Sequence, residues 1–232
     1  MALAPGETNE AFIREVDENL RRSQAEEFFR RWGGWVIAAA VLLLAAVGGY
    51  IYWRNHQAQL AADQSEKLAA VMADIGAGNT RTVDQRLAEI QNQGSDEWAG
   101  LARLTGAAFA LQKGNRNTAI EAYRAVAEDG DQPQAVRDAA LLRGTALQFD
   151  SLKPEEVISR LEPMAKPESP WFGTAGELTA MAMLKQNRKS EAGRMFAAIA
   201  ADKEVPGSLR ARAMQIAGTL GVDATAQLPG AE

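Results

Sequence analysis

The sequence predicts an all-α protein, in which a single N-terminal transmembrane helix is followed by an α-solenoid of about four helix pairs and a C-terminal capping helix. Three observations lead to this prediction. An uninterrupted apolar segment lies at residues 32–53. Residues 58–220 contain no alternating or β-branched run of the kind that indicates a strand. Within that second region, a triplet of apolar residues at helical spacing recurs four times at a nearly constant interval.

The chain begins with an amphipathic segment, residues 1–31, which we expect to lie in the cytoplasm. Its apolar residues fall near one helical stripe, and acids and arginines occupy the other positions. Three roles fit such a segment. It either leads into the membrane as a solvated helix, lies along the inner membrane surface, or binds a cytosolic or membrane partner.

Residues 32–53 have the length and composition of a transmembrane helix. At a rise of 1.5 Å per residue, about 20 apolar residues match a hydrocarbon core of about 30 Å. Aromatic side chains that prefer the headgroup level mark both ends of the segment: Trp32, Trp35, Tyr50, Tyr52 and Trp53. The alternative is a cleaved signal peptide, which has a shorter apolar run followed by a small-residue cleavage site. We predict a permanent anchor in contact with membrane lipid.

The orientation of the anchor follows from the basic residues at its two ends. Four arginines lie on the N-terminal side, close to the membrane: Arg21, Arg22, Arg30 and Arg31. On the C-terminal side, Arg54 and Lys67 are the basic residues over a comparable distance. Because the more basic flank stays in the cytoplasm, the C-terminal part is predicted to be exported. In a bacterium this means a single-pass inner-membrane protein with a periplasmic domain.

Residues 54–222 are predicted to form that exported domain, and residues 223–232 a flexible tail. The domain is long enough for one hydrophobic core and too short for a second globular domain. The sequence contains no cysteine, so the domain must be stabilised by packing without disulfides. Short clusters of glycine, proline, asparagine and aspartate separate segments of helix length, which predicts short helices in pairs.

The recurring triplet occupies positions i, i+4 and i+7 of a helix. Its first members lie about 35 to 38 residues apart, which is the period of a helix-pair repeat. A small or branched residue followed one turn later by a large one is suited to the second helix of a pair, where it packs on the first. The four triplets are Val83, Leu87 and Ile90; Ala119, Tyr123 and Val126; Val157, Leu161 and Met164; and Ala192, Phe196 and Ile199.

Two of these segments resemble the second half of a tetratricopeptide repeat. In "KGNRNTAIEAYRAVAEDGDQP", at residues 113–133, Gly114 takes the turn position, Ala119 the small buried position and Tyr123 the aromatic one. The segment "KQNRKSEAGRMFAAIA", at residues 185–200, is similar. The other two units depart from the pattern. Valine replaces the small residue and leucine the aromatic one, so the repeats are degenerate.

The whole arrangement resembles the YfgM-like family, the ancillary subunits of the bacterial SecYEG translocon. The resemblance rests on a short cytoplasmic segment, one span ending "GGYIYWRNHQ", and a run of four degenerate repeats. It implies a periplasmic helper that works beside the translocon on emerging or unfolded polypeptides. Its implied partners are translocon subunits and a membrane-anchored periplasmic chaperone of the prolyl-isomerase type.

Aligning Gly114 with the repeat turn also predicts a groove on the first helices of the pairs. In tetratricopeptide repeats this face lines the concave side of the superhelix. If the register holds, an apolar groove for extended or partly folded clients results, and methionine would let it adapt to many shapes. The alternative is that these residues belong to the core. The residues are Leu101, Leu104, Ala108, Leu111, Met181 and Leu184.

The sequence argues against an enzyme, a metalloprotein and a nucleic-acid-binding protein. His56 is the only histidine and cysteine is absent, which excludes the usual nucleophile and zinc sites. No glycine-rich phosphate-binding motif follows a strand, so we expect no nucleotide or other cofactor. A net charge of −5 gives no basic face for nucleic acid. We therefore expect no catalytic residue and no metal ligand.

Three functions remain from this reasoning. The first is a translocon-associated chaperone or adaptor that binds partners or emerging chains. The second is a structural scaffold that recruits folded machinery of the cell envelope. The third is a regulator that signals inward through its cytoplasmic helix. The family resemblance favours the first.

Overall fold

The computed structural model describes the secondary structure of residues 7–222 and the side chains of residues 30–222. It divides into two compact units, Met1–Asp63 and Gln64–Glu232. Between residues 7 and 222 all regular structure is α-helical, which confirms the predicted fold class. The predicted tail at 223–232 and the side chains of Arg21 and Arg22 lie outside the described residues.

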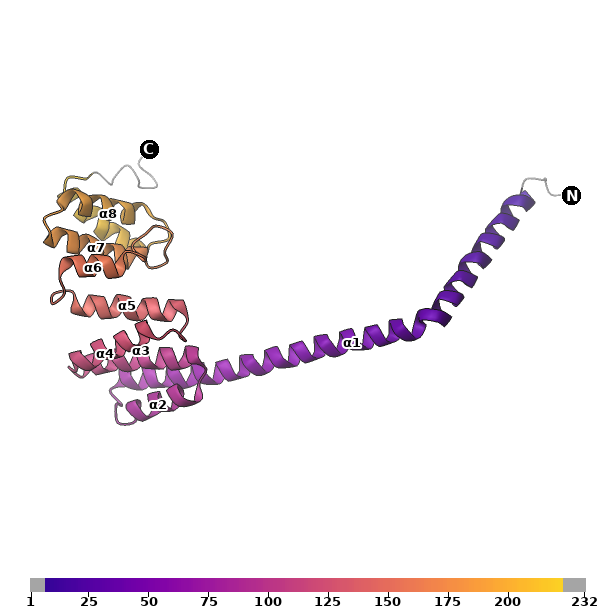
Figure 1. Cartoon of the computed structure of the whole chain (residues 1–232), viewed down its shortest axis with the longest axis horizontal. Helices are drawn as coiled ribbons and strands as arrows, with labels where there is room; N and C mark the ends of the chain where they lie inside the picture. Colours follow the sequence, from indigo (N-terminus) through magenta and orange to yellow (C-terminus); the bar gives the residue numbers. More distant parts are fainter. Residues whose placement is uncertain (1–6, 223–232) are drawn as a thin grey trace. The chain divides into compact units, whose positions relative to one another are not determined.

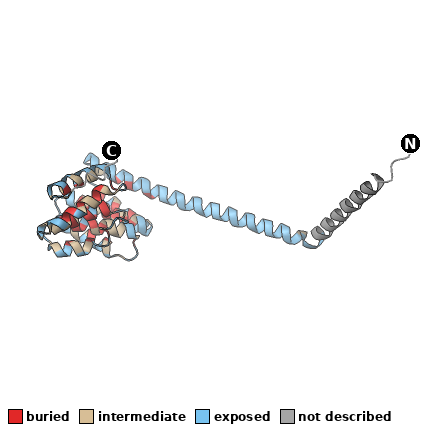
Figure 2. Cartoon of the chain, turned by 90° about the horizontal axis from the view of Figure 1, so that it is seen from above, coloured by how far each residue is buried: buried red, intermediate tan, exposed pale blue. Residues whose placement is uncertain are grey.

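The first unit consists of most of one long helix, α1 (Glu7–Ala77). Figure 2 shows that the part of α1 described in this unit is exposed along nearly its whole length. By length and composition, α1 is the one helix in the described chain that is long and apolar enough to cross a membrane. The sequence places the domain boundary at residue 54, whereas the compact second unit begins at Gln64.

The second unit is a stack of helix pairs, labelled α2 to α8 in Figure 1. The first helix of the first pair is the end of α1, residues 64–77. The remaining helices are α2 (Val83–Gln93), α3 (Asp96–Gln112), α4 (Arg116–Glu128), α5 (Gln134–Gln148), α6 (Pro154–Leu161), α7 (Phe172–Lys185), α8 (Lys189–Ala201) and α9 (Gly207–Thr219). They form the pairs α1–α2, α3–α4, α5–α6 and α7–α8, and α9 follows as a single helix.

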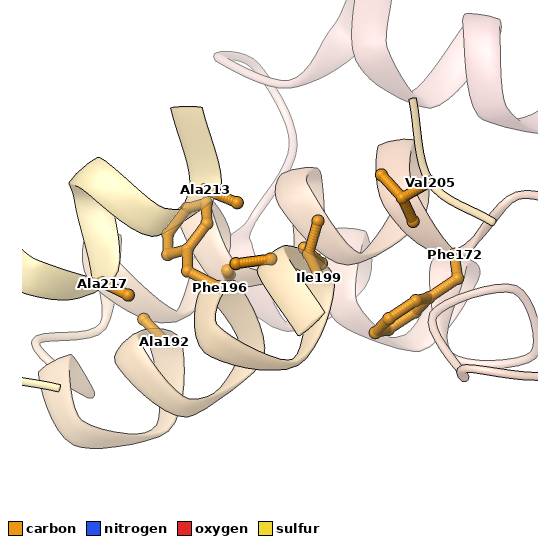
Figure 3. Close-up of a cluster of buried hydrophobic side chains, with 9 residues drawn as sticks. Phe172, Ala192, Phe196, Ile199, Val205, Ala213 and Ala217 are labelled. Atoms are coloured by element: carbon orange, nitrogen blue, oxygen red, sulfur yellow. The ribbon is translucent and has the colours of Figure 1, made fainter. Parts of the chain in front are cut away.

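Each pair shares a hydrophobic cluster with the first helix of the next pair. All twelve residues of the recurring triplets are buried, and they form the centres of four clusters. Figure 3 shows the last cluster, in which Phe196 and Ile199 of α8 lie among side chains of α7 and α9. Burying side chains of this size stabilises the fold by about 1.5 to 3 kcal/mol each. Four such clusters follow one another along the stack, and each joins a pair to the first helix of the next pair or to α9.

The turns inside three of the four pairs depend on a residue with a left-handed backbone. Gly78, with φ of 79°, follows α1, and there Asn79 N donates to Asp74 O at 2.8 Å. Gly114, with φ of 81°, follows α3, and Asn187, with φ of 61°, follows α7. The next N–H in each case reaches back to a carbonyl in the last turn: Asn115 N donates to Ala110 O and Arg188 N to Met183 O, both at 2.9 Å. This 6→1 bond is the Schellman cap, which glycine and asparagine form at least cost.

The segments α3–α5 and α7–α9 are equivalent modules, related by a shift of 73 positions. The bounds of α4 and α8 match under this shift, as do their buried triplets. Trp98 corresponds to Trp171, and Gly100 to Gly173. Further matches are Gly114 with Asn187, Asp129 with Asp202, Pro133 with Pro206 and Ala140 with Ala213.

The modules differ on the outer face of their third helix. Leu142 of α5 is buried in the cluster formed with α6 and α7. The corresponding residue of α9 is Gln215, which is exposed. A terminal repeat needs a polar outer face, so α9 has the side chains of a capping helix.

Candidate partner-binding surfaces

The aromatic residues predicted at the membrane interfaces are exposed on α1. This holds for Trp32, Trp35, Tyr50, Tyr52 and Trp53. Arg30 and Arg31 are exposed as well. His56 stacks on Tyr52, with ring centroids 6.4 Å apart and ring planes inclined by 3°. Within the described residues no group of histidine, aspartate and glutamate side chains is arranged to hold a metal ion.

The residues of the predicted first-helix groove fall into two classes. Leu101, Leu104 and Leu184 contact the hydrophobic clusters, and Leu104 is only 8 % exposed. Leu111 and Met181 are 39 % and 42 % exposed. Ala108 is half-buried. Helix α3 packs both on α4 and on the following pair, so much of its apolar surface is used inside the solenoid.

The described part of the second unit exposes few large apolar side chains. Met72, Leu111 and Met181 are the ones that stand out, and they come from three different helices. Surfaces that bind proteins by apolar contact alone usually offer a contiguous patch of several hundred Å². A binding site on this unit must therefore use polar groups as well.

A cleft of about 490 Å³ lies between α4, α5 and the end of α6. Its apolar lining includes Tyr123 and Leu141, and Gly144 lets the two long helices approach closely. Two parallel rows of polar side chains border it. Asn117, Glu121, Arg124 and Glu128 follow one another along α4, and Thr145 and Gln148 along α5. Arg160 contributes from α6. None of these residues belongs to the groove predicted from the sequence.

One of the helices that border the cleft, α6, is short. It has 8 residues, whereas the equivalent helices α4 and α8 have 13. Pro163 follows two residues after its last residue and opposes its continuation. The loop before α6 is held to α7 by Lys185, whose Nζ lies 3.0 Å from Asp150 Oδ1 and 4.2 Å from the ring centroid of Phe149. The cleft thus lies beside the shortest of the helices α1 to α9.

Thr145 is the most deeply buried polar group in the lining of the cleft. The residue is 1 % exposed, and its hydroxyl has no hydrogen-bond partner within the described chain. Thr179 of α7 is equally buried, at 2 %, and its hydroxyl is also unpaired, but it does not line the cleft. Beside Thr145, Gln148 Nε2 donates to Gly144 O at 3.1 Å. A buried unpaired hydroxyl costs stability, so Thr145 is a candidate for binding a group from outside.

The loop after α4 is fixed by Asp129. Its carboxylate accepts the N–H of Asp131 at 3.1 Å and pairs with Arg103 of α3 at 2.8 Å. The Asp131 N–H, followed by Arg103, lowers the pKa of the Asp129 carboxyl below its usual value of 3.8. The pairing orients α5 relative to α3 and α4, and with it one wall of the cleft.

Sequence reasoning missed the cleft, although one signal for it was present. Pro154 begins α6 and Pro163 follows its end, so the two prolines limit the helix to about two turns. A shortened second helix was therefore predictable from the sequence. Whether the Thr145 hydroxyl has a partner depends on the packing of neighbouring helices, and no local pattern carries that information.

Comparison with known proteins gives one match. A family model described as a tetratricopeptide repeat-like domain matches residues 26–216. No curated protein and no solved structure matches the chain.

Proposed function

Because the chain belongs to the tetratricopeptide repeat-like domain family, we propose that it is a non-enzymatic, membrane-anchored adaptor that binds other proteins through its helix pairs. Within that role we place it at the bacterial inner membrane. The repeat unit then faces the periplasm, beside the Sec translocon, and acts on emerging or unfolded polypeptides as a chaperone or adaptor.

The observation that carries the proposal is the extent of helix α1. This single helix contains both the apolar segment at residues 32–53 and, at residues 64–77, the first helix of the first pair. Leu68 and Val71 of α1 are buried against α2 and α3. A membrane anchor and a repeat unit that share one helix suit a protein whose partners lie at the membrane.

The finer parts of the proposal rest on sequence features. The arginines before the apolar segment support a cytoplasmic N-terminus by the positive-inside rule. The resemblance to the YfgM-like family supports the translocon and a membrane-anchored periplasmic chaperone as partners. Tetratricopeptide-type repeats typically serve as interaction scaffolds, which supports a role without catalysis.

Orientation can be tested with a reporter enzyme that is active only outside the cytosol, fused after Glu232. The fusion is expected to be active in bacterial cells. A fusion in which both Arg30 and Arg31 are replaced by glutamate should be less active, because the charge bias is reduced. Activity of a cytosol-specific reporter at the same terminus would contradict the proposed topology.

Partners can be tested by site-specific photocrosslinking from the repeat unit of the full chain in cells. A photoreactive residue at Leu111 or Met181, which are exposed, is expected to crosslink to translocon subunits and to nascent exported chains. The control replaces residues 32–53 by an unrelated membrane span. Crosslinks to one folded envelope complex, with none to the translocon, would instead support a structural scaffold, which the small exposed apolar area of the repeat unit also permits.

A further inference from the structure

We propose that the cleft between α4, α5 and α6 binds a short extended segment of an uncharged polypeptide and takes one of its apolar side chains. The inference rests on the proposed function, in that the ligand is an unfolded chain. It goes further by assigning a site built from two neighbouring pairs, outside the first-helix face on which the sequence predicts a groove.

The size and lining of the cleft suit a few residues of a polypeptide. A volume of about 490 Å³ lies within the range of about 300 to 1,000 Å³ that is typical of ligand sites. Leu141 and Ala127, which are half-buried, provide apolar surface for a side chain, whereas Tyr123 is only 4 % exposed and adds little. The polar groups along both long helices surround that surface. An apolar centre with a few convergent polar groups is the usual design of a binding site.

The polar groups favour an extended backbone over a helix. An extended segment has free N–H and C=O groups, whereas the backbone of a helix is hydrogen-bonded within itself except at its ends. The Thr145 hydroxyl can donate to a carbonyl or accept from an N–H, and the Asn117 amide can do both at once. The Asn117 side chain makes no hydrogen bond within the described chain, and Thr145 is buried and unpaired. Asn117 is exposed and meets water, so Thr145 is the side chain that lacks a partner, and a ligand with free backbone groups can supply one independently of its sequence.

The charges around the cleft favour a neutral segment. Glu121 and Glu128 on one side are offset by Arg124 on the same helix, and none of the three forms an ion pair within the described residues. Arg160 is neutralised by Glu156, at 2.6 Å. Because both positive and negative side chains border the cleft, a ligand with a net charge of either sign would be repelled by some of them as well as attracted by others.

The polar groups of the cleft are specific to one module. Under the shift of 73 positions, Thr145 corresponds to Gly218, Glu121 to Arg194 and Asn117 to Ser190. The second module keeps the buried framework of the first but not these side chains. The cleft is therefore a feature of α4 and α5, and the second module supplies matched control positions.

The test compares Thr145→Val with Thr179→Val in the full chain, reconstituted in lipid nanodiscs. Both variants remove a buried, unpaired hydroxyl and keep the shape of the side chain, so neither should lower the unfolding temperature. The probe is a short fluorescent peptide of alternating leucine and asparagine, uncharged and extended, and its binding is measured by fluorescence anisotropy. Thr145→Val is expected to weaken binding about tenfold, the value of one lost hydrogen bond to a buried site, and Thr179→Val to leave it unchanged.

A second pair of variants covers the case in which Thr145→Val folds poorly. Asn117→Ala should weaken binding several-fold, and Ser190→Ala, at the corresponding place on α8, should not. Binding of the peptide that none of the cleft variants weakens would overturn this assignment while leaving the proposed function intact. If neither this peptide nor a permanently unfolded, carboxymethylated protein binds the wild-type chain, both the assignment and the chaperone role fail. Preferential binding of a preformed helical peptide of the same composition would also overturn the assignment.

Discussion

Gly173 of α7 and Val205, in the turn before α9, are in such close contact that a Cβ built on the glycine would lie 2.9 Å from Val205 Cγ1. Val205 is buried and branched at Cβ, so it has little freedom to move aside. The equivalent glycine of the first module, Gly100, is approached in the same way by Gln132 and Val136. In both modules, a glycine in the first helix allows the third helix to pack closely.

Substitution of this glycine should therefore destabilise the repeat unit. Gly173→Ala is expected to lower the free energy of unfolding by about 1 to 3 kcal/mol, because the added methyl overpacks a filled site. The control is Gly218→Ala in α9, where nothing lies within 4 Å of the added Cβ. There the higher helix propensity of alanine should stabilise by about 1 kcal/mol. Denaturant titration of both variants measures the two effects, and changes of the same sign would contradict the explanation.

The recurring triplets should contribute most of the packing energy. Phe196 is 1 % exposed and lies at the centre of the α7–α9 cluster (Figure 3). Phe196→Ala is expected to lower the free energy of unfolding by about 3 to 5 kcal/mol, through lost burial and the cavity that remains. Met181→Ala, at an exposed site, should change it by less than about 0.5 kcal/mol. Thermal unfolding followed by circular dichroism distinguishes the two.

The charge of Asp129 should stabilise the turn between α4 and α5 in a pH-dependent way. Its pKa is lowered in the folded state, so the stabilisation is present above the usual value of 3.8 and is lost as the pH falls through the lower, folded-state value. Asp129→Asn is therefore expected to lower the unfolding temperature at neutral pH and to have no effect in strong acid. The control is Glu168→Gln, an exposed carboxyl without an ion pair in the described chain. A constant difference between Asp129→Asn and wild type at all pH values would show that charge is not the cause.

A charge in the middle of the apolar segment should impair membrane insertion. Leu43→Arg is expected to cost about 3 kcal/mol of insertion free energy on the translocon-derived scale. Leu60→Arg is the control, because Leu60 lies on the same helix beyond the predicted span. The fraction of protein that resists alkaline extraction from membranes should fall for the first variant only. Equal extraction of both variants would argue against residues 32–53 as the anchor.

The sequence predicts the fold well because helix pairs are encoded locally. A small residue such as Ala119 and a large one such as Tyr123, one turn apart, identify a second helix, and their recurrence identifies the repeat. The left-handed caps at Gly114 and Asn187 are also visible as short motifs. The shift of 73 positions between modules is equally a property of the sequence, but it becomes convincing only when the glycine contacts are seen in three dimensions.

Surfaces are predicted less well, because exposure depends on neighbouring pairs. Leu104 and Leu111 lie on the same helix and have the same chemistry, yet Leu104 is buried by α4 and α5 while Leu111 is exposed. The extent to which the next pair covers α3 decides how exposed each of the two leucines is. The cleft near Thr145 likewise combines residues of three helices from two neighbouring pairs. Properties that depend on the relative length of neighbouring helices cannot be obtained from periodicity alone.

The exposed Gln215 of α9, in place of the buried Leu142 of α5, has a practical consequence for engineering longer arrays. A copy of α6 and α7 placed behind α9 would meet an amide where it requires an aliphatic side chain. A designer who wishes to lengthen the stack would replace Gln215 by leucine and Gly218 by a larger residue. Without these replacements, the appended helices would meet an amide and a glycine at the two positions that α5 fills with Leu142 and Thr145.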